Sequence, residues 1–528
     1  MSEEYEARRI PRTMATQHPD NARVPEWCDG EVIDGDAEIY EAYFAYAMLG
    51  CQEVMWDSEG KDADTRVVRK LLNRNVEFFR ERTLGEDFFL TYRIPNPKLE
   101  VVERKVAVET LQNIPVAYDV ASSFYNRAVT PIFEVILPLT TDSKELLMLS
   151  NYYKKSIAAD GEIVLDGATK VEDWLGSFKP KSINVIPLVE DFESLIAIDH
   201  IVKPYIHAVK PRRLRVFIAR SDPALNYGLA CAVLLAKIAL SKLRRVEQEL
   251  QVKIHPIIGV GSKPFRGHLS PENLDYFLQE YRGLATVTIQ SALRYDYPLD
   301  QVKACVKSLN EKLPNGEATL IEFYEEEILR EALQKFRRQY ENTIEALAPF
   351  VNSIAAYVPP RRARKLHIGL FGYSRCVAGV CLPRAITFSA ALYSVGLPPE
   401  FIGLKTLSLL NDKELEIVKK HYVMLKHDLS FVGGYVSWEN LNLLMDMHVK
   451  VAERTGMSPE QLKIGLAKVM EDLQAAEETL GIKIGPRTLT QRKHENFTNN
   501  FLISYLEREN EEAKKAFLEA AKLRNCLG

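Results

Sequence analysis

The stretch Ile183-Asn-Val-Ile-Pro-Leu-Val-Glu190 is a short apolar run that ends in an acidic residue. Such a run is typical of a strand that is buried on both faces of a parallel sheet. Seven other runs repeat this pattern, at residues 53–57, 88–93, 132–138, 214–222, 254–262, 285–291 and 366–373. Most of them are separated by stretches of helical pattern. The sequence therefore predicts an α/β fold in which eight βα units close into a (βα)8 TIM-like barrel.

Helical patterns fill the intervals between these runs and continue after the last one. The intervals lie at roughly 62–83, 99–113, 143–159, 192–208, 224–250 and 270–282, long enough for crossover helices. The interval 297–364 is longer, so we expect additional helices inserted before the eighth strand and at the C-terminus. We expect a single elaborated domain over residues 1–528. It would consist of an arm at 1–35 over the barrel mouth, a barrel at 36–395 and a helical region at 396–528.

The composition disfavours several classes of protein. Of the 528 residues 27% are charged, and the net charge of −4 gives no electrostatic footprint for nucleic acid. No stretch approaches the ~20 apolar residues of a membrane span, and the N-terminus lacks the basic and apolar regions of a signal peptide. The seven cysteines have no zinc-binding spacing and are expected to be reduced thiols. We therefore expect a cytoplasmic protein with no nucleic-acid or membrane partner.

Acidic residues follow two consecutive runs. Glu190 and Asp222 end predicted neighbouring strands, and the C-terminal strand ends of such a barrel meet at one mouth. Two carboxylates there suit Mg²⁺ or Mn²⁺, with Asp57 and Asp191 as reserve ligands. Glu190 and Asp222 could equally be helix caps or salt-bridge partners, and the spacing alone does not decide between these interpretations.

Basic residues also gather after the runs. Lys263 and Arg266 lie in the glycine-containing loop 259–267, where backbone N–H groups could approach a phosphate. A plain strand-to-helix turn explains this loop as well. Three more arginines lie at other strand ends, namely Arg93, Arg294 and Arg375. Each could bridge to a neighbouring strand, but several around one mouth favour a multiply charged anionic substrate.

One histidine is a candidate for proton transfer. His18 follows an unusual string that begins at Met14, in a turn rich in Pro, Asn and Asp. A histidine beside a proline in a loop is by default a surface residue. The surrounding string makes His18 a candidate general acid or base.

Four strings resemble the archaeal-type phosphoenolpyruvate carboxylases, and the resemblance covers essentially the whole chain. They are Met14-Ala-Thr-Gln-His-Pro-Asp-Asn21, Ile186-Pro-Leu-Val-Glu-Asp191, Arg220-Ser-Asp-Pro-Ala-Leu-Asn-Tyr-Gly228 and Cys381-Leu-Pro-Arg-Ala-Ile-Thr-Phe388. The resemblance implies that His18 is the catalytic histidine and that Glu190 and Asp222 hold the metal. It also implies catalytic roles for Arg266 and Arg375, and substrate binding by Arg384.

The resemblance further implies an activity. Phosphoenolpyruvate and bicarbonate would give oxaloacetate and inorganic phosphate, through carboxyphosphate and a metal-bound enolate, in an anaplerotic, carbon dioxide-fixing lyase. The expected cofactor is Mg²⁺ (or Mn²⁺), and the expected assembly is a homotetramer. Two other kinds of protein remain open, another metal-dependent phosphoenolpyruvate or pyruvate barrel enzyme and a non-catalytic metabolite-binding barrel.

Two positions depart from the bacterial branch of that family. Val260 and Leu225 stand where that branch has an arginine and a lysine. We expect Lys263, Arg93 or Arg294 to supply the missing positive charge in substrate binding.

Overall fold

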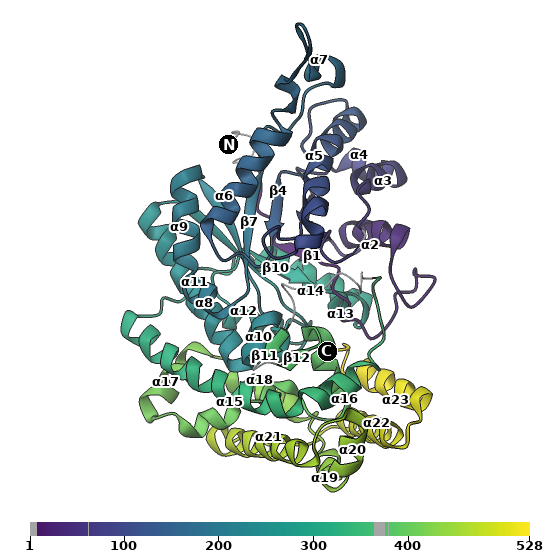
Figure 1. The fold of residues 1–528 in the computed structure, drawn as a ribbon, viewed down its shortest axis with the longest axis vertical. Coiled ribbons are helices and arrows are strands. Elements are labelled where there is room, and N and C mark those ends of the chain that lie inside the picture. Colours follow the sequence, from purple (N-terminus) through teal and green to yellow (C-terminus); the bar gives the residue numbers. More distant parts are fainter. Residues whose placement is uncertain (1–7, 62, 364–374, 378–379) are drawn as a thin grey trace.

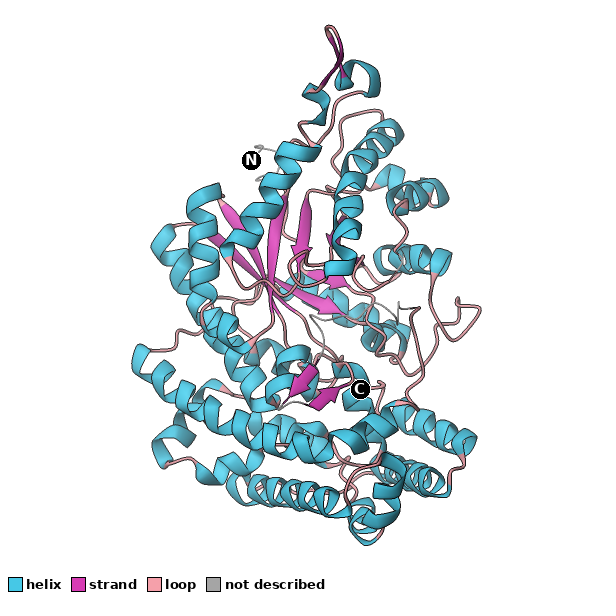
Figure 2. Ribbon diagram, viewed as in Figure 1, coloured by secondary structure: helices cyan, strands magenta, loops and turns pink. Residues whose placement is uncertain are grey.

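The computed structural model describes residues 8–61, 63–363, 375–377 and 380–528. Eight parallel strands close into a barrel in the order β1-β10-β9-β8-β7-β4-β3-β2 (Figures 1 and 2). They are β1 (Thr13–Ala15), β2 (Glu53–Asp57), β3 (Phe89–Arg93), β4 (Glu134–Leu137), β7 (Asn184–Val189), β8 (Arg213–Ile218), β9 (Lys253–Ile258) and β10 (Thr286–Ile289). The predicted fold class is therefore confirmed.

The barrel closes through a strand that the sequence analysis placed in an arm. Met14 in β1 pairs with Thr288 of β10 and with Glu53 of β2. Because β1 has only three residues in a polar segment that contains prolines, it offers no periodic signal. The run 366–373, predicted as the eighth strand, lies outside the described residues, and eight described strands close the barrel. The long helical interval consequently follows the last barrel strand and is not inserted before it.

Alternation along the strands divides the core in two. One cluster fills the barrel interior with Met14, Met55, Ile136, Ile186, Leu188, Phe217, Ala219 and Ile257. The residues between these positions, such as Val54 and Trp56, belong to the larger cluster formed with the surrounding helices. This period of two is expected for strands buried on both faces, and it leaves the last inward residues to line the mouth.

Helices surround the barrel. They are α2 (Gly35–Ala47), α3 (Val67–Arg74), α4 (Val76–Glu81), α5 (Arg104–Tyr125), α6 (Ser143–Tyr152), α8 (Phe192–Ile196), α9 (Ile198–Val209), α10 (Ser221–Tyr227), α11 (Leu229–Leu250), α12 (Leu274–Glu280), α13 (Ser291–Tyr295) and α14 (Leu299–Lys312). Between α6 and β7, the hairpin β5 (Val164–Asp166) and β6 (Thr169–Lys170) with α7 (Val171–Leu175) projects from the rest of the molecule (Figure 1).

A layer of helices packs at the other end of the molecule (Figure 2). It contains α15 (Phe323–Ala355), the hairpin β11 (Arg375–Val377) and β12 (Val380–Leu382), α16 (Ala385–Ser394), α17 (Asp412–His421), α18 (Leu425–Gly433), α19 (Trp438–Asp446), α20 (His448–Thr455), α21 (Pro459–Leu480), α22 (Leu489–Glu507) and α23 (Asn510–Leu523). The segments that follow β8 and β9 contact α16 and α18. The layer therefore packs on the loops at the C-terminal ends of these strands.

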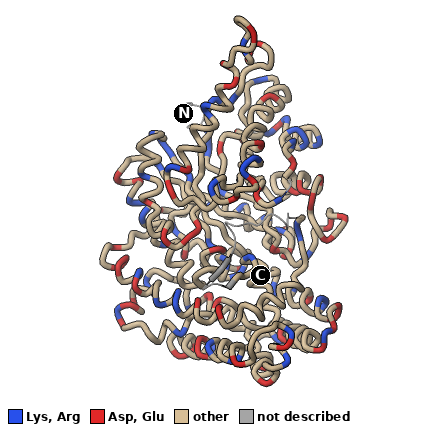
Figure 3. The backbone as a smooth tube through the Cα atoms, in the orientation of Figure 1, with Lys and Arg blue, Asp and Glu red and all other residues tan. Residues whose placement is uncertain are grey.

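Charge and hydropathy agree with the composition. Basic and acidic residues are interspersed along the described part of the backbone (Figure 3). Among the described residues, no helix combines the length and the apolar character that crossing a bilayer requires. Five cysteines are free thiols, whereas Cys381 is disulfide-bonded, so the expectation of reduced thiols is wrong at that position.

Candidate active site

The two predicted metal ligands follow adjacent strands. Glu190 comes directly after β7, and Asp222 lies in the first turn of α10 after β8, which pairs with β7. Glu190 is buried, and one of its carboxylate oxygens accepts a hydrogen bond of 2.8 Å from the Leu139 N–H. Asp222 is half-buried. The expectation that both acids lie at neighbouring strand ends is consistent with this topology.

The reserve ligands have other partners. Asp57 receives two hydrogen bonds from Arg93, at 2.9 and 2.6 Å, and both side chains are buried. Asp191 caps α8, because its Oδ1 accepts a hydrogen bond of 2.9 Å from the Ser194 N–H. Asp191 is therefore a helix cap in this structure, although the sequence analysis considered it only as a reserve ligand. The bridge interpretation holds for Arg93.

Arg266 lies at the centre of a buried polar network. Its Nη1 donates to Asp20 Oδ2 at 2.9 Å and to the Gly528 backbone oxygen at 2.8 Å, and its Nη2 donates to Gln290. Its Nε donates to Ser221 Oγ at 3.1 Å. These bonds fix the plane of the guanidinium.

Lys263, three residues earlier in the same loop, has a different environment. Its side chain is buried and its Nζ lies 4.8 Å from the ring centre of Phe431 and 5.6 Å from that of Tyr435, both in or next to α18. Within the described residues it forms no ion pair with a carboxylate. Rings of this kind stabilise a cation without neutralising it.

Arg294 belongs to a second buried network. It donates to Glu41 Oε1 at 3.0 Å and to the Thr16 carbonyl oxygen at 2.6 Å. Glu41 also accepts from Arg362, so two arginines share one carboxylate. Burial alone would raise the pKa of Glu41, but Arg362 and Arg294 outweigh it and lower this pKa to about 2.

His18 follows β1 closely. Its ring is half-buried, and its Nδ1 lies 2.7 Å from Thr16 Oγ1. His18 therefore comes after the C-terminal end of a barrel strand, where catalytic residues of such barrels are found. This placement depends on β1, which the sequence did not predict.

The remaining predicted arginines are less fully described. Arg375 begins β11, and its side chain lies outside the described part of the structure. Arg384 is half-buried and precedes α16, as the residue at the N-cap position.

Three residues that the sequence analysis missed support this site. Asp20 is fully buried and binds both Arg266 and the Ala292 N–H, at 2.9 and 2.8 Å. Arg220 donates to the carbonyl oxygens of Pro264 and Phe265. Glu400 accepts from the Phe265 N–H at 3.0 Å. Asp20 and Arg220 lie inside strings quoted above, so their positions in the sequence could have suggested them, whereas Glu400 lies outside those strings.

A further group of possible metal ligands lies behind the same loop. Ligand atoms of His268, His427 and Asp428 are within 4.8 Å of one another. However, His268 Nδ1 lies 2.6 Å from Asp428 Oδ1, and the other oxygen of Asp428 accepts from Tyr422. Nitrogen ligands also suit Mg²⁺ less well than carboxylates. We interpret the group as a hydrogen-bonded brace between the loop and α18.

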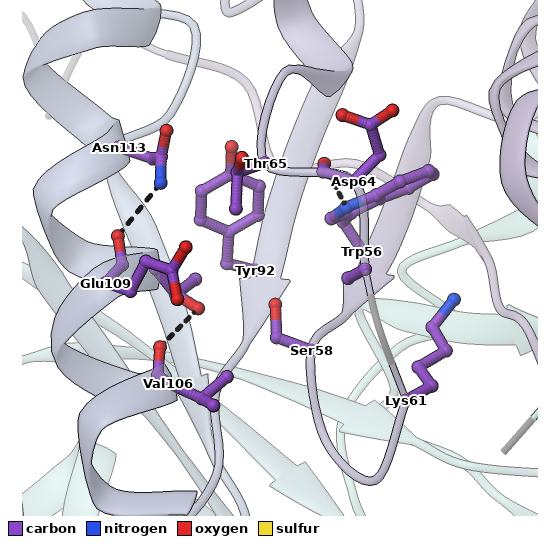
Figure 4. A pocket seen from close by; sticks show the side chains of 11 residues that line it. Trp56, Ser58, Lys61, Asp64, Thr65, Tyr92, Val106, Glu109 and Asn113 are labelled. Carbon is purple, nitrogen blue, oxygen red and sulfur yellow. Dashed lines mark hydrogen bonds between the residues drawn. The ribbon is translucent and has the colours of Figure 1, made fainter. Parts of the chain in front are cut away.

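A small cavity of about 130 Å³ lies beside the barrel (Figure 4). Trp56, Ser58, Lys61, Tyr92 and Asn113 are among its lining residues. None of the residues predicted for chemistry lines it, and Trp56 belongs to the core between barrel and helices. Its lining residues Ser58 and Lys61 follow β2, so the cavity lies beside the C-terminal end of that strand.

Comparison with known proteins identifies relatives over the full length of the chain. Residues 10–528 match the model of a family described as phosphoenolpyruvate carboxylase. Proteins of that name from Metallosphaera sedula and Caldivirga maquilingensis are 46% and 47% identical. These alignments cover 99% and 98% of this chain, and 100% and 99% of the relatives. A third, from Picrophilus torridus, is 45% identical over 98% of this chain and 99% of its own.

Proposed function

The chain belongs to the phosphoenolpyruvate carboxylase family, and from this premise we propose how its barrel mouth carries out the reaction. The enzyme converts phosphoenolpyruvate and bicarbonate to oxaloacetate and inorganic phosphate. The observation that supports our assignment of the site is the position of Glu190 and Asp222 after adjacent strands, in a mouth that also holds buried cations.

Glu190 and Asp222 are the residues that we propose to hold Mg²⁺ (or Mn²⁺). Both offer hard oxygen donors, and the Leu139 N–H orients the buried carboxylate of Glu190. When bound, the metal supplies Lewis-acid stabilisation of the negative charge that develops on the substrate. Asp57 and Asp191 are weaker candidates because their carboxylates already bind Arg93 and cap α8.

The difficulty of the first step is repulsion between anions. A bicarbonate oxygen attacks the phosphorus, the bond from phosphorus to the enol oxygen breaks, and carboxyphosphate and the enolate of pyruvate form. Arg266 and Arg375 would stabilise the transferred phosphoryl group, together with Lys263. Lys263 is the best candidate for the charge missing at Val260 and Leu225, since Arg93 and Arg294 are already in ion pairs.

The other arginines would bind the substrate around this centre. In our assignment Arg93, Arg294 and Arg384 contribute to the positive potential that holds the carboxylate of phosphoenolpyruvate. Arg93 and Arg294 would do so through partly neutralised pairs, and they are therefore expected to contribute less than Lys263.

His18 would act in the second step. It would take the proton from carboxyphosphate, which then breaks into carbon dioxide and phosphate. The carbon of the enolate attacks carbon dioxide to form oxaloacetate. The helices packed on the mouth would exclude water, which could otherwise protonate the enolate to pyruvate.

We also propose the wider setting of this enzyme. The chain would act as one elaborated domain in a cytoplasmic homotetramer, in an anaplerotic role. These statements rest on the family alone.

The reaction is tested by measuring oxaloacetate and phosphate together. We expect both to require phosphoenolpyruvate, bicarbonate and Mg²⁺ or Mn²⁺, and label from ¹⁸O-bicarbonate to appear in phosphate. Phosphate release without bicarbonate, or a need for a nucleotide, would instead indicate another phosphoenolpyruvate barrel enzyme. A lack of turnover with either metal would favour a metabolite-binding barrel.

A further inference from the structure

Exposed apolar side chains are concentrated in one part of the chain. Of the 23 large apolar residues that are exposed in the described structure, ten lie between residues 101 and 175. Five belong to the hairpin and helix that project from the barrel, here called the tip (residues 160–176). They are Ile163, Val164, Leu165, Trp174 and Leu175. Single exposed apolar residues are ordinary, but a cluster of this kind marks an interaction surface.

The tip projects from the molecule and carries exposed apolar and acidic side chains, as an element that binds into a groove would. It extends away from the barrel at the end opposite the C-terminal helices (Figure 1). The side chain of Trp174 is 72% exposed, although tryptophan is a residue that dominates the energetics of protein interfaces. The tip carries five acids and a single lysine, Lys170. None of these acids forms an ion pair within the described residues.

A second apolar surface, a hollow with basic residues at its edge, lies between α5 and α6. Its volume is about 560 Å³, within the ~300–1,000 Å³ of pockets that enclose sizeable ligands. Apolar side chains form most of its lining, among them Leu111, Leu149 and Met148, the last of which is 71% exposed. We call it the outer groove.

Basic side chains surround the outer groove. Lys98, Arg104 and Lys105 line it, against one acid, Glu145, which is already bound by Lys98 at 3.0 Å. Arg104 and Lys105 are exposed and form no ion pair in the described structure. The tip and the outer groove are therefore both apolar, and their charges are opposite in sign.

We propose that the outer groove receives the tip of a second copy of this chain, so that the two elements form a subunit interface. A two-fold axis would make the contact twice, since each copy carries one tip and one groove. Trp174 and Leu175 would lie against Met148 and Leu149, and the acids of the tip would face Arg104 and Lys105. The inference rests on the homo-oligomer proposed above and is independent of the carboxylation chemistry.

Substitutions on both surfaces test the apolar contact. Trp174→Asp in the tip and Met148→Asp in the groove should each weaken self-association at least tenfold in sedimentation equilibrium. Both residues are exposed in the single chain, so folding should be retained, as circular dichroism would show. Leu489→Asp is the matched control, because Leu489 is 86% exposed on α22 and should leave association unchanged.

Charge reversal tests the pairing itself. Glu162→Lys with Asp166→Lys in the tip should weaken association, and so should Arg104→Glu with Lys105→Glu in the groove. A chain with all four substitutions should associate again, because the signs are complementary once more. Failure of this rescue, or dissociation by the tip variants alone, would show that the tip binds elsewhere and would overturn the pairing.

The wild-type protein separates this inference from the proposals on which it rests. A monomer at micromolar concentration would overturn both the oligomer and the interface. An oligomer unaffected by the tip variants would overturn only the interface. Oxaloacetate formation, measured on the same samples, reports on the reaction independently of either result.

Discussion

Buried cations at the two ends of the barrel differ in their carboxylate partners. Near the N-terminal ends of the strands, Arg215 of β8 is matched by two carboxylates, Glu53 and Glu134, with N to O distances of 2.6 to 3.0 Å. At the mouth, Arg266 has one carboxylate partner, Arg294 and Arg362 share another, and Lys263 has none among the described residues. The buried cation of the N-terminal network thus has two carboxylate partners, whereas at the mouth the buried cation Lys263 has none among the described residues.

The pKa values of buried groups also differ between the two ends. In the N-terminal network, burial alone would lower the pKa of Arg215, but Glu53 and Glu134 outweigh it and raise that pKa. Near the mouth, burial raises the pKa of Glu400 and of Asp296 to about 7. Acids that are partly protonated at neutral pH offset less of the positive charge.

The largest expected effect is loss of the proposed metal ligands at the mouth. Glu190→Gln and Asp222→Asn should each abolish metal-dependent turnover, because a missing carboxylate weakens metal binding and exposes the developing charge. Initial rates, with Mn²⁺ binding followed by electron paramagnetic resonance, measure this. Asp191→Asn is the matched control. It should leave both stability and turnover largely intact, because the Asn side-chain oxygen can still accept the Ser194 N–H that caps α8. Near-normal activity of Glu190→Gln at low metal concentration would exclude it as a ligand.

His18→Asn should separate the two halves of the reaction. The cations that promote phosphoryl transfer are unchanged, so bicarbonate should still attack phosphoenolpyruvate. Oxaloacetate should fall by about 10²–10⁴-fold, while pyruvate and phosphate still form when bicarbonate is present. Separate assays of pyruvate and oxaloacetate check this. A full yield of oxaloacetate would show that His18 is a surface residue, and loss of both products would assign it to the first step.

Breaking the N-terminal network should affect stability and not catalysis. Arg215→Met leaves Glu53 and Glu134 buried without their cation, which typically costs about 3–5 kcal/mol. The free energy of unfolding in urea measures the loss. Adding Glu53→Gln and Glu134→Gln should recover part of it, since no unpaired ion then remains. The KM for phosphoenolpyruvate of the folded Arg215→Met protein should be unchanged, and a raised KM would contradict the division between the two ends.

Removing a positive charge at the mouth should lower catalysis and leave stability largely unchanged. Lys263→Ala should cost about 2–4 kcal/mol in kcat/KM, the scale of one preorganised donor, with a smaller loss for Arg294→Ala because Arg294 is already paired with Glu41. Steady-state kinetics give both values. A larger loss for Arg294→Ala would assign the missing charge to that residue, and unchanged rates in both variants would point to Arg93.

The barrel was predictable from sequence because seven of its strands are long, buried and followed by polar clusters. β1 was not, since three residues carry no period and its pairing with β2 and β10 is a tertiary effect. In the site, the type and position of Glu190 and Asp222 followed from the strand ends. The partners of Arg93, Arg294 and Arg266 did not, because Asp57, Glu41 and Asp20 come from other parts of the chain.

The smallest expected effect concerns Glu400, whose carboxyl group accepts hydrogen bonds from the Phe265 N–H and the Tyr393 hydroxyl behind the Arg266 loop. Burial raises its pKa to about 7 from an ordinary 4.5, so the folded protein holds this proton more tightly than the unfolded chain. The stability that the proton confers is complete below pH 4.5 and is lost as the pH rises to about 7.

Glu400→Gln tests this because glutamine has no proton to lose. The free energy of unfolding of the variant relative to wild type should rise between pH 5 and 7, by on the order of 1–3 kcal/mol, and then level off. Urea unfolding across this range measures it. Since Glu400 supports the loop and touches no proposed substrate group, kcat at pH 6 should be nearly the same in both proteins. A stability difference that is constant across this range would mean that Glu400 is ionised throughout, and that the carboxyl groups near the mouth offset its positive charge after all.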